Sequence, residues 1–178
     1  MPGSDWQFLF LRAIDLELML RVLLAFVLGG LIGYERETTQ RPAGLRTHML
    51  VAAGSTAFTV AGVYGFVGEG TVRDPSRVAA QIVTGVGFLG AGTIWRTSST
   101  VRGLTTAASI WLVAAVGMLV GGGMYALAAF TTLCGFATLR WGRPASRRRR
   151  ILKAAGEPSI TGEGVPIEEL EEEESILD

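Results

Sequence analysis

The most informative stretch of this 178-residue sequence is Arg77-Val-Ala-Ala-Gln-Ile-Val-Thr-Gly-Val-Gly-Phe-Leu-Gly-Ala-Gly-Thr-Ile-Trp-Arg96. Between its two arginines lies an apolar segment that is long enough to cross a membrane and that carries one glutamine and four glycines. A plain membrane anchor needs neither the amide nor the glycines, because both serve contacts between helices in lipid. The stretch therefore predicts a transmembrane helix that packs against other helices.

The composition of the whole chain also predicts a membrane protein. Apolar residues make up 49% of it, 24 residues are glycine, and the mean hydropathy is +0.39, which is too apolar for a soluble domain of this length. The 16 basic and 16 acidic residues balance, so net charge predicts no class of partner. The single cysteine, Cys134, excludes a disulfide within the chain and a metal site built from cysteines.

Five apolar ranges have roughly the length needed to cross the hydrocarbon core of a bilayer. They are residues 16–34, 45–67, 78–95, 104–121 and 124–139. We therefore expect an all-α, polytopic fold in which residues 1–143 form a domain of five transmembrane helices. The first range lacks the small-residue cleavage site of a signal peptide, so we expect a retained helix there.

The placement of the arginines predicts the orientation, because basic residues near span ends stay on the cytoplasmic side. Five spans put 12 of the 16 basic residues on one side, which predicts an external N-terminus and a cytoplasmic C-terminus. Residues 144–178 form a charged tail with too few apolar residues for a core, so we expect disorder there. The arginine run at 147–150 directly follows a span and indicates topology and contact with anionic lipid, not a nucleic-acid site.

The glycines at 85, 87 and 90 match the dinucleotide-binding fingerprint, but that motif requires a strand-turn-helix unit, which a transmembrane span does not supply. Small residues let helix backbones approach closely in lipid, so we assign the glycines of the first and third spans to helix packing. Alternatively, the glycines of the third span break its helix and line a cavity. The packing glycines are Gly29, Gly33, Gly85, Gly87, Gly90 and Gly92. Their faces also suit a homo-oligomer.

Gln81 is a polar side chain inside an apolar span, so its amide requires partners. Helical spacing places Gln81 and Gly85 on one face, which predicts that the amide lies in the seam between helices. Two interpretations stay open. In the structural one, Gln81 hydrogen-bonds to Ser55, Thr56 or Thr59 of the second span. In the functional one, it binds a translocated or bound solute.

A second polar cluster lies where the spans reach the predicted cytoplasmic side. Its members are Glu35, Arg36, Glu37, Arg46, Thr47, His48, Arg96, Arg102 and Thr105, and His48 by itself is interpreted as a hydrogen-bonding residue at a helix end. One interpretation is a topology signal with salt bridges, and the other is a basic vestibule that accepts an acidic partner or an anionic head group. No carboxylate pair, group of histidines or nucleophile beside a base can be placed in one site from this sequence. We therefore predict no enzymatic activity, no cofactor and no nucleic-acid partner.

Four motifs together resemble the membrane domain of the MgtC/SapB family. They are Gly33-Tyr-Glu-Arg-Glu37, Gln40-Arg-Pro-Ala-Gly-Leu-Arg-Thr-His48, the stretch from Arg77 to Gly92, and Val101-Arg-Gly-Leu-Thr-Thr-Ala-Ala108. Larger members of that family carry a folded cytoplasmic domain after the membrane part, whereas about 38 residues of charged tail follow here, so the resemblance is to the shorter, SapB-like branch. The resemblance points to six functional polar residues: Glu35, Arg36, Arg46, Gln81, Arg102 and Thr105.

The resemblance implies a bacterial protein of the cytoplasmic (inner) membrane that supports adaptation to low Mg2+, acid or host stress, and virulence. It also implies a partner, because members of the family are described as binding and restraining the proton-translocating ATP synthase. We favour such a regulator over a Mg2+ transporter with a path past Gln81, because Mg2+ is held through carboxylates and no acidic residue lies deep in a predicted span. Acidic residues at the outer ends of the spans keep transport as the alternative. The sequence identifies no metal site.

Overall fold

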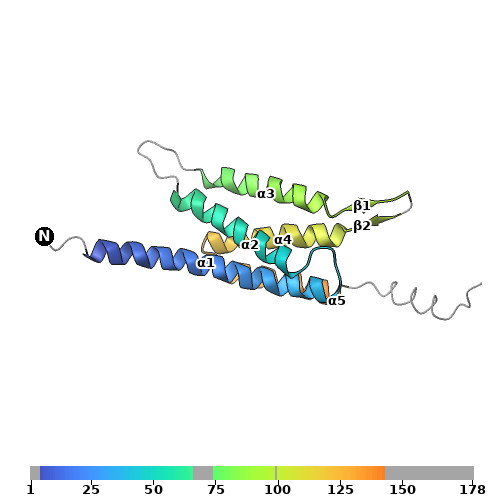
Figure 1. Cartoon of the computed structure of the whole chain (residues 1–178), viewed down its shortest axis with the longest axis horizontal. Helices are drawn as coiled ribbons and strands as arrows, with labels where there is room; N and C mark the ends of the chain where they lie inside the picture. Colours follow the sequence, from blue (N-terminus) through green and yellow to red (C-terminus); the bar gives the residue numbers. More distant parts are fainter. Residues whose placement is uncertain (1–4, 66–73, 99, 143–178) are drawn as a thin grey trace, which may run out of the picture. The chain divides into compact units, whose positions relative to one another are not determined.

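The computed structural model describes residues 5–65, 74–98 and 100–142, with side chains from residue 14 onward. Within these ranges the chain is helical apart from one short β-hairpin, which confirms the predicted all-α class (Figure 1). The elements are α1 (Asp5–Thr38), α2 (Leu45–Val60), the π-helical turn η1 (Ala61–Gly65), α3 (Pro75–Ala91), β1 (Trp95–Arg96), β2 (Val101–Arg102), α4 (Leu104–Gly121) and α5 (Tyr125–Trp141). The predicted tail at 144–178 lies outside the described residues.

Successive helices run in opposite directions between the same two ends of the bundle (Figure 1). α2 and α4 are therefore parallel neighbours: His48 near the start of α2 contacts Ser109 near the start of α4, and Thr56 further along α2 contacts Gly117 further along α4. The α1–α2 pair has the most extensive contact, and α5 packs against α1 and α4. α3 packs mainly against α4 and less against α2, and an open groove separates α2 from α3.

Local chemistry explains where α3 and α4 begin. Asp74 caps α3, because its carboxylate accepts hydrogen bonds from the backbone N–H of Ser76 at 3.1 Å and from the Ser76 hydroxyl, and Pro75 opens the helix. The hydrogen bond from the Ser76 side chain holds the pKa of Asp74 below its usual value. α4 begins after Gly103, whose φ of 91° is left-handed, and a Cβ there would overlap the Thr93 carbonyl oxygen.

The core lies between α1, α2 and α4. Its fully buried aliphatic side chains include Ile32 of α1, Ala52 of α2 and Val116 of α4. Glycines let these three helices approach closely: a Cβ added at Gly29 of α1 would lie 2.7 Å from the Ala52 Cβ, and one at Gly117 of α4 would overlap the Ala52 carbonyl oxygen. α1 and α4 therefore both contact α2 closely at Ala52.

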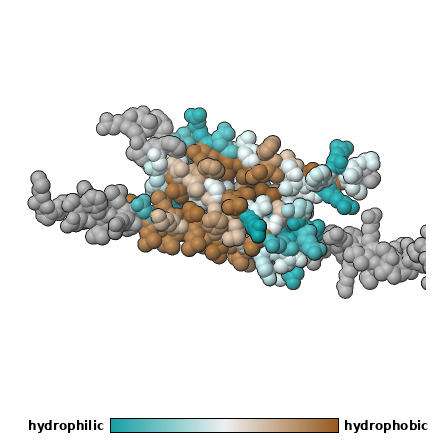
Figure 2. All heavy atoms as spheres, viewed as in Figure 1, coloured by the Kyte–Doolittle hydropathy of each residue, from teal (hydrophilic) through white to brown (hydrophobic). Residues whose placement is uncertain are grey.

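Two of the described helices are long and apolar enough to cross a membrane, over Ile14–Thr38 and Leu104–Gly121. Figure 2 shows hydrophobic residues over the middle of the bundle and hydrophilic residues toward its ends. Large apolar side chains such as Leu23, Phe58 and Phe130 are exposed, as expected of a surface that contacts lipid. These features support a membrane location, and the count of five crossings stays a prediction.

The hairpin formed by β1 and β2 differs from the sequence prediction. α3 ends before the predicted boundary of the third span, and Trp95 lies in β1, where it pairs with Arg102 of β2. The helix stops because the backbone N–H and the hydroxyl of Thr93 both donate to the Gly90 carbonyl oxygen, at 3.0 and 2.8 Å. The apolar run hid this break, because strand residues and membrane-helix residues are both hydrophobic.

Candidate functional site

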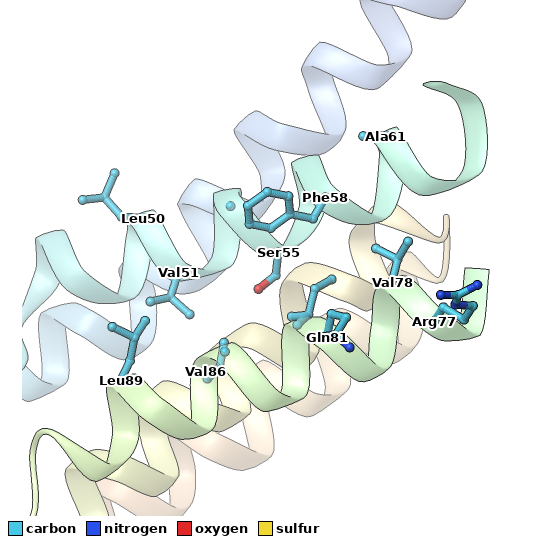
Figure 3. A pocket seen from close by; sticks show the side chains of 13 residues that line it. Leu50, Val51, Ser55, Phe58, Ala61, Arg77, Val78, Gln81, Val86 and Leu89 are labelled. Carbon is cyan, nitrogen blue, oxygen red and sulfur yellow. The ribbon is translucent and has the colours of Figure 1, made fainter. Parts of the chain in front are cut away.

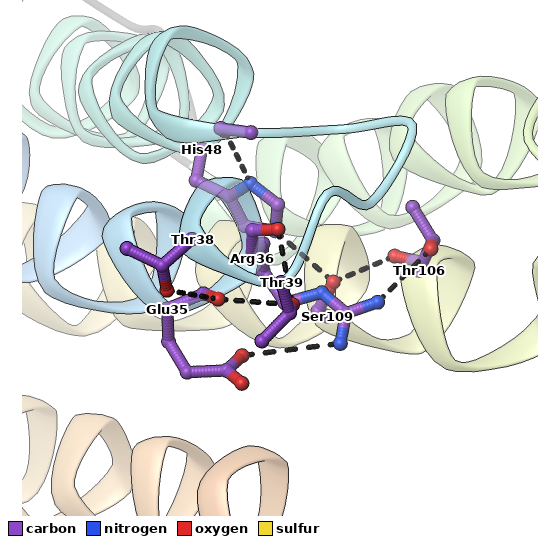
Figure 4. A network of polar contacts seen from close by, with 8 residues as sticks. Glu35, Arg36, Thr38, Thr39, His48, Thr106 and Ser109 are labelled. Atoms are coloured by element: carbon purple, nitrogen blue, oxygen red, sulfur yellow. Dashed lines mark hydrogen bonds and ion pairs between the residues drawn. The ribbon is translucent and has the colours of Figure 1, made fainter. Parts of the chain in front are cut away.

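A buried polar network lies at one end of the bundle, where α1, α2 and α4 meet (Figure 4). Arg36 near the end of α1 is 4% exposed, and its Nη2 donates a hydrogen bond to Thr106 Oγ1 of α4 at 3.1 Å. The Nη1 atom of Arg36 lies 3.9 Å from Oε2 of Glu35, which is 3% exposed. A buried guanidinium and a buried carboxylate compensate each other's charge, so this pair belongs to the interior of the bundle.

His48 joins the network from α2. Its side chain is fully buried, with Nδ1 2.8 Å from the Gly44 carbonyl oxygen and Nε2 3.0 Å from Ser109 Oγ of α4. A carbonyl oxygen only accepts hydrogen bonds, so Nδ1 carries a proton and donates to Gly44. Ser109 Oγ also lies 2.8 Å from the Thr106 carbonyl oxygen. The network thereby links all three core helices. The sequence analysis placed Glu35, Arg36 and His48 in the polar cluster, but it did not include Thr106 and Ser109 of α4.

The structure divides the polar cluster that the sequence predicted. Thr105 is exposed, and its neighbour Thr106 points into the bundle in its place, because successive residues on an α-helix point about 100° apart. Arg46 and Arg102 are exposed as well, and neither forms an ion pair with another described residue. The cluster therefore consists of the buried Glu35, Arg36 and His48 and of separate groups that face outward.

The outward-facing arginines share their end of the bundle with the hairpin. β1 and β2 pair in the register Trp95 with Arg102 and Arg96 with Val101. All four residues are exposed, and the Trp95 side chain is 70% exposed. We call Arg46, Trp95, Arg96 and Arg102 the rim surface. Trp95 and Arg102 lie on one face of the hairpin and Arg96 on the other, because successive strand residues point to opposite faces. Guanidinium groups and indole rings bind carboxylates, phosphates and apolar side chains.

An open groove of about 850 Å3 lies between α2 and α3 (Figure 3). The polar side chains that line it are Ser55 of α2 and Arg77 and Gln81 of α3, and its other lining residues are glycine, alanine or larger apolar residues. Figure 3 shows the Ser55 hydroxyl pointing from α2 toward α3. The described lining thus contains a cation and an amide but no carboxylate.

Gln81 lies exposed in this groove and forms no hydrogen bond with a described side chain. Two of its predicted partners in α2 are occupied elsewhere, since Thr56 Oγ1 donates to the Gly117 carbonyl oxygen at 2.7 Å and Thr59 Oγ1 to the Ser55 carbonyl oxygen at 2.8 Å. The amide therefore faces an open groove instead of the closed seam that helical spacing predicted. The physical reason is that α3 packs mainly against α4 and leaves its contact with α2 open.

The two predicted packing glycines of the first span lie in a tight contact. A Cβ added at Gly29 would lie 2.7 Å from the Ala52 Cβ, and one at Gly33 would lie 2.8 Å from the Leu45 Cα. Distances this short exclude a side chain at both positions unless the helices separate. α1 and α2 are therefore in backbone contact near the buried network.

The predicted packing glycines of α3 make looser contacts. A Cβ at Gly85 or Gly87 meets no described atom within 4 Å, so the described part of this chain does not pack against these two glycines, and their role in helix packing stays a prediction. A Cβ at Gly90 would lie 3.6 Å from the Ala107 Cβ of α4, and one at Gly92 would meet the last turn of α3. α3 continues unbroken past Gly85, and Gly85 lines the groove.

Comparison with family models matches residues 22–148 to the MgtC family. This chain belongs to the MgtC family. The matched range contains the buried network, the rim surface and the groove, so all three features lie in the MgtC-family part of the chain. No solved structure matches the chain.

Three curated proteins show how similar the relatives are. The Escherichia coli K12 protein named "Putative magnesium transporter YhiD" is 49% identical over 115 residues, which are 62% of this chain and 54% of that protein. Protein MgtC of Brucella abortus (strain 2308) is 52% identical over 109 residues, 61% of this chain and 44% of that protein. Protein MgtC of Salmonella typhimurium (strain LT2) is 46% identical over 132 residues, 72% of this chain and 55% of that protein. The chain thus spans about half the length of the curated relatives it matches.

In this MgtC-family chain, the buried network, the rim surface and the groove differ in the chemical groups that they present. The buried network holds helices together, the rim surface offers cations to an anionic or acidic group, and the groove offers apolar walls with Arg77 and Gln81 beside them. Among the described residues, no group of three or more His, Cys, Asp or Glu side chains could hold a metal ion.

Proposed function

We propose that this chain is a multi-pass protein of the bacterial cytoplasmic membrane, with five crossings, an external N-terminus and a cytoplasmic C-terminus. The alternating direction of α1 to α5 between the same two ends supports this arrangement. The described arginines support the orientation, because basic residues near span ends stay in the cytoplasm. One end carries Arg36, Arg41, Arg46, Arg96, Arg102 and Arg140, and the other carries Arg21 and Arg77.

At the cytoplasmic end, we infer that the rim surface binds another membrane complex and that this binding regulates the complex. The observation that carries the inference is the division of the polar cluster. The charges of Glu35 and Arg36 compensate each other inside the bundle, whereas the three rim arginines face outward without an ion partner among the described residues. Exposed guanidinium groups attract an acidic segment, and Trp95 adds an aromatic anchor of the kind that dominates interfaces.

The family supplies the context for this role. A relative whose name mentions magnesium transport, together with the resemblance to MgtC proteins, supports a function in adaptation to low Mg2+, acid or host stress. The same resemblance makes the proton-translocating ATP synthase the partner to test first. We propose that the chain acts by binding and not as an enzyme, since its polar residues are arranged as a helix-linking network and an exposed basic surface.

Charge reversal at the rim surface tests this function. In membranes from cells that produce each variant, Arg46→Glu and Arg102→Glu should lower cross-linking to ATP synthase subunits at least about tenfold, because each change replaces an attraction with a repulsion. The matched control is Arg140→Glu, an exposed arginine at the same end on α5, which should leave cross-linking unchanged. Equal loss in all three variants, or none in any, would contradict a partner site at the rim surface.

The second function is Mg2+ transport, which the name of one relative and the exposed Gln81 amide favour. The charge of the groove opposes it, because Mg2+ moving past Gln81 would also pass the Arg77 cation and would meet no carboxylate in the described lining. Purified protein in vesicles with a trapped Mg2+-sensitive dye separates the two functions. We expect no flux from wild type or from Gln81→Leu of equal thermal stability. Flux in wild type that Gln81→Leu abolishes would establish a transporter.

A further inference from the structure

The groove between α2 and α3 is a feature that the proposed function does not use. The described residues leave this groove open, since a Cβ added at Gly54 of α2 or Gly85 of α3 would meet no described atom within 4 Å, and both glycines line the groove. The contrast with the other face of α2 is sharp, because a Cβ at Gly117 of α4 would overlap the α2 backbone. A volume of about 850 Å3 is within the range of small-molecule sites.

The walls of the groove select a hydrocarbon occupant. Val51, Phe58, Ile82 and Val86 are among the side chains that line it, and most of the lining is apolar. Such walls offer dispersion contacts to an alkyl chain. These apolar side chains offer no hydrogen bonds, so a polar group placed against them without a partner would lose about 2–7 kcal/mol on leaving water.

The groove is long enough to hold an acyl chain from one leaflet of a bilayer. On α3 its lining runs from Arg77 to Leu89, which is about 18 Å along the helix axis. The hydrocarbon core is about 30 Å thick, so each leaflet contributes about 15 Å. The acyl chain of a lipid in one leaflet therefore fits along the groove, with its head group at the end of the groove that carries Arg77.

A cation marks one end of the groove. Arg77 lies exposed in the first turn of α3 and forms no ion pair with another described residue. Figure 3 shows Gln81 one turn further along the same helix, beside the groove. Arginine binds phosphate oxygens through two parallel N–H donors, and an amide N–H suits an ester oxygen below them. Asp74, the acid that caps α3, is turned toward Ser76.

We propose that this groove binds one anionic phospholipid, with an acyl chain between α2 and α3, the phosphate on Arg77 and an ester oxygen on Gln81. In the topology proposed above, this lipid belongs to the outer leaflet. The proposal goes beyond the proposed function, which uses the rim surface at the opposite end of α3. A failure of one therefore leaves the other intact.

Native mass spectrometry of the detergent-purified full chain, incubated with phosphatidylglycerol or phosphatidylethanolamine, tests the proposal. Wild type should retain phosphatidylglycerol at least about tenfold more than phosphatidylethanolamine, the gain expected from one charge-assisted contact. Arg77→Gln should lose this preference, while Arg96→Gln, a change on the hairpin, should keep it. Gly85→Leu fills the groove and should abolish retention of both lipids.

The open glycines of α3 supply a matched control. Gly87→Leu adds the same side chain to the same helix at another open position that does not line the groove, and it should retain lipid as wild type does. Gly54→Leu fills the groove from α2 and repeats the test if Gly85→Leu does not fold. Retention of phosphatidylglycerol by both groove-filling variants would overturn the proposal. Conversion of a dimer to a monomer by these variants, with lipid retention unchanged, would overturn it too and assign the groove to a second copy.

Discussion

At the scale of single residues, the Thr106 hydroxyl is the acceptor that joins Arg36 of α1 to α4. Thr106→Val keeps the shape of the side chain but removes this acceptor from a buried guanidinium. We expect the free energy of unfolding to fall by about 1–3 kcal/mol, the cost of removing a partner from a buried polar group. Reversible denaturation of the purified protein in mixed micelles measures it.

The neighbouring Thr105 provides the control, because it is exposed and should tolerate valine within about 0.5 kcal/mol. If Thr106→Val and Thr105→Val lower the free energy of unfolding equally, the hydrogen bond from Arg36 to Thr106 does not stabilise the fold. Sequence reasoning named Thr105 as a member of the polar cluster and did not name Thr106, the residue of this pair that is buried. Packing against neighbouring helices decides which face of a helix is buried. On α4 this face includes Thr106 together with Ser109 and Ile110.

At the scale of elements, the α2–α4 contact depends on Gly117. A Cβ there would overlap the Ala52 carbonyl oxygen and lie 2.9 Å from the Ser55 Cβ. Gly117→Ala must therefore push α4 away from α2, and we expect a loss of roughly 1–3 kcal/mol in the free energy of unfolding. Gly87→Ala, in open space on α3, should leave stability unchanged or raise it by up to about 1 kcal/mol, because alanine favours the helix. Thermal unfolding of both variants side by side measures the difference.

A stable Gly117→Ala variant together with a destabilised Gly87→Ala variant would contradict the helix arrangement described above.

Sequence spacing predicted close packing for Gly29 and Gly33, where the structure has tight contacts, but also for Gly85 and Gly87, where it has open space. It passed over Gly117 entirely. Regular spacing places small residues on one face of a helix, but it does not say whether another helix of the chain covers that face.

At the scale of the whole molecule, the lengths of the apolar runs predicted an all-helical bundle, and the structure confirms that class. The hairpin was not predicted, and a cavity lined by glycines of the third span stood only as an alternative. Both depend on where α3 lies relative to α2 and α4, and hydropathy along a chain carries no information about which helices are neighbours.

The five-crossing arrangement predicts which side of the membrane each end of α3 reaches. In a Cys134→Ser background, an impermeant thiol reagent should label Ser76→Cys in intact cells, because Ser76 lies in the first turn of α3 at the proposed external end. Ser98→Cys, in the hairpin segment that follows α3, should react only after the membrane is permeabilised. Labelling of both positions from one side would mean that α3 does not cross, and it would contradict the five-crossing arrangement. If Ser98→Cys reacts in intact cells and Ser76→Cys only after permeabilisation, α3 still crosses the membrane, but in the reverse direction. The six arginines at the end of the bundle that carries the rim surface would then lie outside, against the tendency of basic residues to stay in the cytoplasm.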